Sequence, residues 1–428
     1  MRVLLTGANG LIGTATLAKL LAEGHEVVAL ARRAGRSAPG LRWVALDLRN
    51  AGQPERWLPH LAGVDAVINC VGVLQDSARD STDAAHTSGP AALFAACART
   101  GVRRIIHLSA IGVDRDAPSE FSRTKAAGDK MLTASGLDWV ILRPSVVVGR
   151  GAYGGSALFR GLAALPIIWR VPDAGPLQVV HLDDVVATIL WFLRPEAPAR
   201  IELDLAGPER LAFDDVVAAF RQWLGWKPAR RISMPRWLMA DMYRLGDFAG
   251  WLGWRPPIRS TAQHEIVRGA IGDPMPWTSI TGIVPRSLKV SLASEPATVQ
   301  EKWFAKLYLL KPVVFVVFSA FWIATAFVSL GPGWDTGIGL MHEGGVHGLV
   351  APLTVVAGAL ADFCIGIGIA FRRTTRPALY AALVLSLGYA VIGSILVPRL
   401  WIDPLGPMLK IWPVLALNLI ALAILEDR

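Results

Sequence analysis

Cysteine is scarce in this sequence of 428 residues, which contains three: Cys70, Cys97 and Cys364. Their spacing does not pair them as in a disulfide framework or a zinc site. Cys70 and Cys97 fall at predicted core positions, so we expect inert thiols in a reducing compartment. A secretory signal peptide is also missing, because the first residues run straight into a predicted strand. We therefore expect the N-terminal domain to stay in the cytosol.

The sequence also lacks a run of lysine and arginine interleaved with aromatic residues, which a nucleic-acid groove would need. We therefore expect no nucleic-acid partner, although the formal net charge is +9. Hydrophobic residues make up 53% of the chain, and most of the long uncharged runs fall in residues 313–426. A positive charge balance in so apolar a chain favours a protein that lies against an anionic membrane surface.

A glycine-rich turn is present near the N-terminus, between a predicted strand at Val3–Thr6 and a predicted helix at Thr14–Glu23. Gly7 permits a tight turn, Gly10 lets a pyrophosphate approach the backbone, and Gly13 lets the helix pack close to the strand. The N–H groups at the start of such a helix bind phosphate. This order of elements predicts a dinucleotide site. Its residues are Thr6, Gly7, Asn9, Gly10, Leu11, Ile12 and Gly13.

Strands and helices alternate from this turn to about residue 230. The predicted strands are Val3–Thr6, Glu26–Ala31, Arg42–Leu46, Ala66–Val71, Arg104–Ser109, Trp139–Leu142, Gln178–His181 and Ile201–Leu205. The helices predicted after Thr14–Glu23 are Gln53–Leu61, Thr87–Thr100, Phe121–Ser135, Asp184–Leu193 and Phe213–Leu224. The strands are continuous apolar runs, which is typical of a parallel sheet with helices on both faces. The predicted fold class is α/β, with a doubly wound parallel sheet.

The C-terminal part of the chain predicts an all-α membrane domain. A helix that crosses a bilayer of about 30 Å needs about 20 apolar residues. Four segments meet this requirement: Pro312–Leu330, Leu349–Phe371, Pro377–Val397 and Pro407–Leu425. We therefore predict a Rossmann-type domain at 1–230, a connector rich in Trp and Pro at 231–305, and a four-span membrane domain at 306–428. The connector is expected to pack on the domain or to lie at a membrane interface.

Charges in the loops predict the orientation of these spans. Lysines precede the first span and three arginines separate the second from the third, whereas loop 331–348 has no Lys or Arg. The positive-inside rule then places both chain termini in the cytoplasm. We expect an integral protein of a bacterial-type inner membrane, with the lipid bilayer as a partner.

The N-terminal motifs together resemble those of the extended and atypical short-chain dehydrogenase/reductases, over roughly residues 1–225. The matching motifs are Thr6-Gly-Ala-Asn-Gly-Leu-Ile-Gly13, Asp47-Leu48, Val71-Gly72, His107-Leu-Ser-Ala-Ile-Gly112, Leu142-Arg-Pro-Ser145 and Val180-His-Leu-Asp-Asp184. Within that superfamily the domain is similar to the branch that includes the nucleotide-binding accessory subunit of respiratory complex I. The C-terminal region resembles the DoxX-like family of small membrane domains.

This resemblance implies an NAD(P) site. Asp47 and Leu48 would meet the adenine, Val71 and Gly72 would form the turn after the fourth strand, and the loop around Pro144 would lie near the nicotinamide. The charge at the end of the second predicted strand bears on whether the site accepts the 2′-phosphate that distinguishes NADP(H) from NAD(H). Arg32 and Arg33 stand where an acidic residue would repel a 2′-phosphate, and guanidinium groups pair well with phosphate. We therefore expect NADP(H) to be preferred over NAD(H).

The resemblance also implies a catalytic trio of serine, tyrosine and lysine. Ser109 and Lys125 match the serine and lysine positions, but Phe121 occupies the tyrosine position. In the family the lysine binds the nicotinamide ribose, the tyrosine moves a proton to or from the substrate oxygen, and the serine holds that oxygen. Three alternatives follow: Tyr153, Ser122 or a water replaces the donor, the substrate needs no donor, or the domain binds nucleotide without turnover.

Other polar clusters are weaker candidates, and we predict no metal site. His181-Leu-Asp-Asp184 is interpreted as a strand-to-helix corner, with Asp183 or Asp184 capping the helix. His342, Glu343 and His347 are separated by two flexible glycines. Asp362 falls within the second predicted span, where it is either a structural residue or one that handles a quinone or a proton, and Lys410 is a candidate partner.

These observations favour a membrane-anchored oxidoreductase. Its substrate would be lipophilic, such as a quinone, an isoprenoid or a lipid carbonyl, because a tethered enzyme meets such molecules at the bilayer. The alternative is a non-catalytic NADP(H)-binding subunit that stabilises a membrane protein complex or senses its redox state. A membrane scaffold with a vestigial nucleotide site is a third hypothesis, and the intact glycines argue against it.

Overall fold

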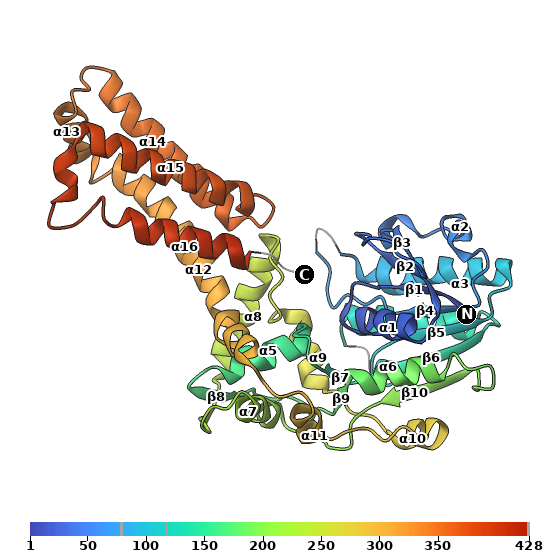
Figure 1. Ribbon diagram of the computed structural model, residues 1–428. Helices are drawn as coiled ribbons and strands as arrows, with labels where there is room; N and C mark the ends of the chain where they lie inside the picture. Colours follow the sequence, from blue (N-terminus) through green and yellow to red (C-terminus); the bar gives the residue numbers. More distant parts are fainter. Residues whose placement is uncertain (78–79, 117, 426–428) are drawn as a thin grey trace. The chain divides into compact units, whose positions relative to one another are not determined.

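The computed structural model describes residues 1–77, 80–116 and 118–425, which form two compact units (Figure 1). Unit 1 comprises Met1–Asp247 and Pro256–Ala305, and unit 2 comprises Phe248–Arg255 and Lys306–Arg428. Each unit is described separately below.

Unit 1 is built on a parallel sheet, in which seven strands pair in the order β10-β6-β5-β4-β1-β2-β3 among the described residues. These strands are β1 (Arg2–Thr6), β2 (Glu26–Ala31), β3 (Leu41–Ala45), β4 (Ala66–Asn69), β5 (Arg104–Leu108), β6 (Asp138–Pro144) and β10 (Ile201–Leu205). Alternate residues of β1 enter opposite sides of the core: Val3 and Leu5 belong to one hydrophobic cluster and Leu4 to the other. Both faces of the sheet are therefore buried, which confirms the predicted doubly wound α/β class.

The helices of this sheet are α1 (Leu11–Ala22), α2 (Leu58–Leu61), α3 (Gly89–Thr100), α4 (Glu120–Thr133), α6 (Leu182–Trp191) and α10 (Met275–Thr281). The helix predicted over 53–61 is instead split into a 3₁₀ turn, η2 (Pro54–Arg56), and the short α2. Pro54 and Pro59 explain this break, because proline donates no backbone hydrogen bond. A π-helical turn, η3 (Ala84–Ser88), precedes α3, and a 3₁₀ turn, η1 (Leu48–Asn50), follows β3.

A smaller lobe of unit 1 combines short strands and helices. Its elements are β7 (Val146–Val148), α5 (Gly154–Ala163), β8 (Ile167–Arg170), β9 (Val179–His181), α7 (Phe213–Trp223), β11 (Arg230–Ser233), the part of α8 (Arg236–Trp251) up to Asp247, α9 (Ser260–Arg268) and α11 (Leu288–Ala293). The connector residues differ in their burial. Trp277 is fully buried in the sheet core and its Nε1–H donates to Thr188 Oγ1 at 2.9 Å, whereas Trp237 and Trp251 are about 70% exposed.

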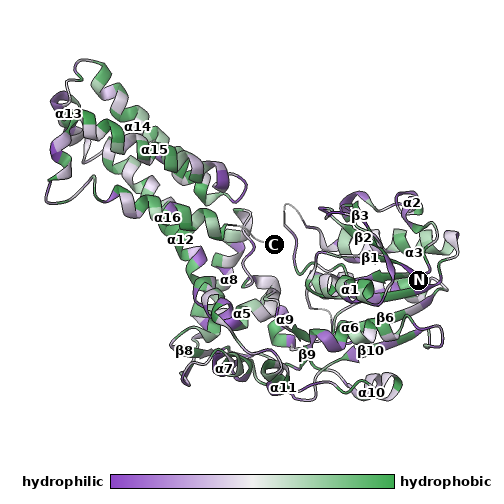
Figure 2. Cartoon of the chain, viewed as in Figure 1, coloured by the Kyte–Doolittle hydropathy of each residue, from purple (hydrophilic) through white to green (hydrophobic). Residues whose placement is uncertain are grey.

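Unit 2 is helical and strongly apolar (Figure 2). It contains the larger part of α12 (Val299–Leu330), then α13 (Trp334–Glu343), α14 (Val350–Ala370), α15 (Thr375–Leu396), the 3₁₀ turn η4 (Pro398–Trp401) and α16 (Ile411–Ile424). Among the described residues three helices, α12, α14 and α15, are long and apolar enough to cross a membrane. The fourth predicted span forms α16, a helix of 14 residues, so four spans and the cytoplasmic termini stay predictions.

Candidate nucleotide and catalytic site

The glycine-rich turn between β1 and α1 has the geometry of a phosphate cradle. Gly7 has φ +67°, and a Cβ atom there would lie 2.8 Å from the carbonyl carbon of Cys70. A Cβ atom on Gly13 would overlap the carbonyl oxygen of Gly7, so only glycine lets α1 approach the turn this closely. Helix α1 starts at Leu11, after Gly10. Its first N–H groups are therefore open to phosphate, and the residues present fit a dinucleotide.

Two polar side chains of this motif donate hydrogen bonds to other parts of the protein. Thr6 is buried, and its Oγ1 donates to Asn69 Oδ1 at 2.6 Å, which ties β1 to β4. Asn9 is exposed, and its Nδ2 donates to the carbonyl oxygen of Arg33 at 2.8 Å. The amide of Asn9 thus fixes the backbone at the end of β2, where the adenosine ribose would lie.

The charged residues near this ribose position are partly paired with one another. Arg32 and Arg33 are both exposed, and Arg32 Nη1 lies 2.6 Å from Asp80 Oδ1. Asp47 accepts from the backbone N–H and the guanidinium of Arg49, and that guanidinium lowers the pKa of the Asp47 carboxyl. Arg32 is therefore held in place by Asp80, and the expected preference for NADP(H) stays a prediction.

Lys125 on α4 reaches the carboxyl ends of two neighbouring strands. Its Nζ donates to the carbonyl oxygen of Val71, just after β4, at 3.0 Å, and to that of Leu108, at the end of β5, at 2.7 Å. The side chain is buried, and burial lowers its pKa to about 8 against the opposing charge of Asp129. A Cβ atom on Gly72 would lie 3.7 Å from Nζ, so the glycine leaves space beside the amine.

Ser109 is buried and bonded to an acidic residue that sequence reasoning missed. Its Oγ donates to Asp129 Oδ2 at 2.8 Å, and Arg143 Nε donates to the same oxygen at 3.3 Å. Burial raises the pKa of the Asp129 carboxyl, and Arg143 opposes that shift. Asp129 follows Lys125 by one helical turn, which is the signal that was available in the sequence. Ser109 therefore anchors α4 to β5 through Asp129.

Phe121 lies on the same face of α4 as Lys125, where the family has its tyrosine. Its ring packs against His86 of η3, with ring centres 5.5 Å apart in an edge-on geometry. His86 Nε2 accepts from the N–H of Val73 at 3.0 Å, and Nδ1 lies 2.8 Å from Thr124 Oγ1. Burial lowers the pKa of His86 to about 2. Neither ring supplies a proton at this position.

The other donors considered from the sequence are placed differently. Ser122 is buried, its Oγ donates to Glu265 Oε1 at 2.5 Å, and Arg268 Nη1 donates to Ser122 Oγ at 2.9 Å. Glu265 and Arg268 come from α9, and no sequence pattern singled them out. The Ser122 hydroxyl therefore already donates its proton to Glu265. Tyr153 is the residue before α5 and is 45% exposed, so its role as a donor stays a prediction.

The loop after β6 approaches the nucleotide turn. A Cβ atom on Gly151 would lie 3.0 Å from Leu11 Cδ1 at the start of α1. The carbonyl oxygen of Pro144, at the end of β6, accepts from the N–H of Ile111 at 3.2 Å. Both loops thus meet the carboxyl edge of the sheet, where ligands of doubly wound proteins bind.

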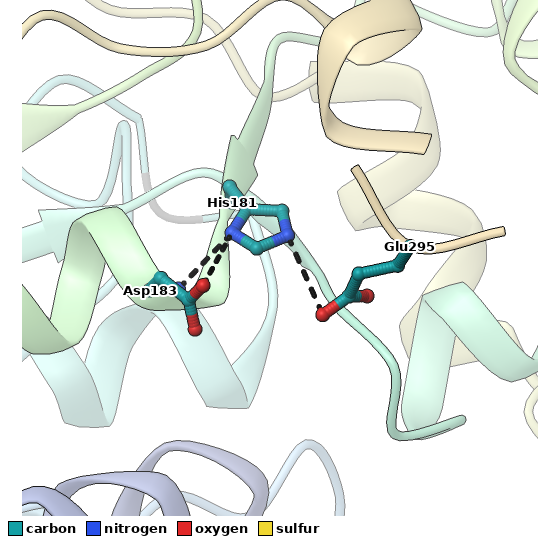
Figure 3. Close-up of side chains that lie close together, drawn as sticks. All are labelled: His181, Asp183 and Glu295. Atoms are coloured by element: carbon teal, nitrogen blue, oxygen red, sulfur yellow. Dashed lines mark hydrogen bonds and ion pairs between the residues drawn. The ribbon is translucent and has the colours of Figure 1, made fainter. Parts of the chain in front are cut away.

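His181 caps helix α6, which corrects the prediction that Asp183 or Asp184 does so. Its Nδ1 accepts from the N–H of Asp183 at 3.2 Å, and Asp184 instead pairs with Arg286 Nη2 at 2.7 Å. Figure 3 shows Nε2 of His181 directed at Glu295, 3.9 Å away. His181, Asp183 and Glu295 thus bring three possible ligand atoms within 4.8 Å of one another, a group that was not predicted from the sequence.

The polar candidates of unit 2 also have protein partners. Tyr389 Oη donates to Asp362 Oδ1 at 3.0 Å, so the observed partner of Asp362 is Tyr389 and not Lys410. Glu343 is paired with Arg399, with guanidinium nitrogens 2.5 and 2.6 Å from its two carboxylate oxygens. The structure thus gives Glu343 an arginine partner that was not predicted from the sequence.

Two protein families match this chain. Residues 7–158 match the family described as NAD(P)H-binding, and residues 319–419 match the DoxX-like family. In the solved structures, the Bordetella bronchiseptica enzyme WbmG in complex with NAD has a TM-score of 0.55 and 16% sequence identity. The match covers 72% of this chain and 96% of WbmG. At this identity the likeness concerns the fold.

Three curated relatives were compared by sequence. An uncharacterized protein of Mycobacterium tuberculosis is 31% identical over 220 residues, covering 51% of this chain and 23% of that protein. This chain thus spans about a quarter of the first curated relatives it matches. Ceramide reductase of Caulobacter vibrioides is 24% identical, covering 54% of this chain and 73% of the reductase. An uncharacterized sugar epimerase of Bacillus subtilis is 32% identical, covering 50% of this chain and 93% of the epimerase.

Proposed function

Because the chain belongs to the NAD(P)H-binding proteins of short-chain dehydrogenase/reductase type and carries a DoxX-like domain, we propose that it is a membrane-anchored oxidoreductase of a lipophilic carbonyl. The substrate would be a lipid carbonyl, an isoprenoid or a quinone that arrives from the bilayer. The named activity of the Caulobacter relative, a ceramide reductase, supports a lipid substrate. NADP(H) is the proposed cofactor, on the strength of Arg33 and Arg32.

The proposal rests on the position of Lys125. An ammonium group has three N–H bonds, and two of them donate to the carbonyl oxygens of Val71 and Leu108. The third is left for a ligand at the carboxyl edge of the sheet. When bound, the nicotinamide supplies hydride chemistry at this edge. Lys125 then gives its third proton to the substrate oxygen: one N–H bond breaks, one O–H bond forms, and solvent protons restore the ammonium.

The pKa of Lys125 suits this role. A general acid works best when its pKa is close to the working pH, and a pKa of about 8 meets that condition. Phe121 provides no proton, so the lysine would perform the step for which the family uses its tyrosine. Asp129, held by Ser109 and Arg143, keeps the part of α4 that carries Lys125 against β5.

The test uses the full chain in lipid nanodiscs with NADPH and three probes: a long-chain aldehyde, an isoprenoid aldehyde and a short-tailed quinone. We expect NADPH fluorescence to shift on binding and NADPH to be oxidised with at least one probe. Lys125→Met should lower oxidation by about 10²–10⁴-fold, and Lys130→Met, on the exposed side of the same helix, should leave it unchanged. Failure of both NADPH and NADH to bind would refute the proposal.

Phe121 favours a second candidate function, a non-catalytic NADP(H)-binding subunit of a membrane protein complex. NADPH that binds but is not oxidised by any of the probes would support this alternative. In that case Lys125→Met should weaken NADPH binding without changing any turnover, because its remaining role is to hold the ribose.

A further inference from the structure

The smaller lobe of unit 1 encloses an apolar cavity that the nucleotide site does not use. It lies between α5, β8, α7, α8 and α9, and no charged side chain lines it in the described part of the chain. The cavity itself measures about 40 Å³, and the empty space around it, counting the part open to solvent, is about 500 Å³. We propose that this cavity binds the alkyl chain of the lipophilic substrate.

The lining suits a linear hydrocarbon chain. Three of the chain's eight methionines, Met234, Met239 and Met242, contribute to it, together with Leu162 and Trp169. Methionine is unbranched and flexible, so its side chain moves aside to widen a narrow cavity when a chain enters. A sugar or a phosphate would need hydrogen-bonding or charged groups that the wall does not offer. The chemistry therefore selects an acyl or isoprenoid chain.

One wall of the cavity, α9, also contacts α4. Ile266 of α9 lines the cavity, and its neighbour Glu265 accepts hydrogen bonds from Ser119 and Ser122, beside Phe121 on α4. Another wall is α5, which starts after Tyr153. In the proposal, the substrate carbonyl therefore lies at Lys125 and its alkyl chain lies in the cavity that α9 lines.

The third wall, α8, is held in place by a close backbone approach. A Cβ atom on Gly246 would overlap the carbonyl oxygen of Ile258, so only glycine fits there. The carboxylate of Asp247 accepts from Arg259 Nε and from the N–H of Ser260, both at 3.3 Å. These contacts join the end of α8 to the start of α9 and shape the cavity between them.

This inference rests on the proposed function only for the identity of the substrate, and its test does not need turnover. The full chain in nanodiscs would be irradiated with a C16 aldehyde that carries a diazirine in mid-chain, and the adducts mapped by mass spectrometry. A C4 aldehyde with the same photoreactive group is the matched probe. We expect adducts of the C16 probe on peptides that contain Met239, Met242 or Leu162, and few with the C4 probe.

Variants make the assignment specific. Met239→Trp and Leu162→Trp fill the cavity and should lower its labelling at least fivefold. Met275→Trp, at a methionine that is 65% exposed, should leave the labelling unchanged. Far-ultraviolet circular dichroism verifies that each variant is folded, whether or not it binds NADPH.

Each outcome decides one of the two proposals. Labelling confined to α12, α14 and α15, or insensitive to both cavity-filling variants, overturns the alkyl-chain site. Cavity labelling in a protein that binds no NADPH supports the site and refutes the oxidoreductase. Turnover of a long-chain aldehyde without cavity labelling supports the oxidoreductase and refutes the alkyl-chain site.

Discussion

The glycine-rich turn and the helix α4 line the same edge of the sheet but are built by different means. The turn is fixed by its backbone: Gly7 and Gly13 leave no room for a Cβ atom. Helix α4 is fixed by buried side chains, with Asp129 joined to Ser109 and Arg143, and Lys125 joined to two carbonyl groups. In the proposed function, cofactor binding would thus depend on the absence of side chains from the turn, and proton transfer would depend on the side chains of α4.

Gly13→Val should have the largest effect, because it tests the backbone half of this contrast. The new side chain would overlap the carbonyl of Gly7 and force α1 away from the turn. We expect loss of NADPH binding by more than a hundredfold and destabilisation by about 1–3 kcal/mol, as for other overpacked sites. Fluorescence titration and thermal unfolding measure the two effects. Gly52→Ala, which meets only an ordinary contact at 4.0 Å, is the control.

Lys125→Met tests the role of the buried side chains on α4. NADPH should still bind, but carbonyl reduction should fall by about 10²–10⁴-fold, the usual contribution of a general acid. In the unchanged protein, reduction should decline as the pH rises through about 8, because the ammonium that donates the proton is then lost. A rate that stays constant up to pH 10 would contradict this role.

Phe121→Tyr would add to α4 the tyrosine hydroxyl that the family uses as its proton donor. Its hydroxyl would stand one helical turn before Lys125, so we expect about a tenfold gain in turnover. The decline above pH 8 should also weaken, since the lysine would no longer be the proton donor. Phe121→Leu, which adds no hydroxyl, is the matched control. A gain with leucine would indicate a steric effect.

Arg33→Ala should produce the smallest change, at the cofactor's second phosphate. A charge-assisted hydrogen bond at an exposed site contributes about 1 kcal/mol, or about fivefold in affinity. We expect NADPH binding to weaken by that factor and NADH binding to stay the same. Arg42→Ala, at an exposed arginine of β3, should affect neither cofactor. Equal losses for both cofactors would remove the preference for NADP(H).

The glycine-rich turn and the sheet were largely predictable from the sequence, and the side-chain contacts of α4 were not. The glycines and the apolar strands follow from local patterns, and each predicted strand is found within two residues of its predicted bounds, although β9 pairs with β7 outside the seven-stranded sheet. Arg143 and Glu265 reach α4 from residues 14 and 143 positions away from their partners. No local pattern encodes such pairs. The cap on α6 was predicted wrongly because His181 reaches the free N–H before either aspartate.

Trp277 has a consequence for how the protein is made. It is fully buried against the sheet, yet it emerges from the ribosome after the whole of the sheet has been synthesised. At a synthesis rate of about 5–20 residues per second, Trp277 is made several seconds after the last sheet strand, β10. The core of unit 1 therefore closes shortly before the first apolar span at α12 leaves the ribosome.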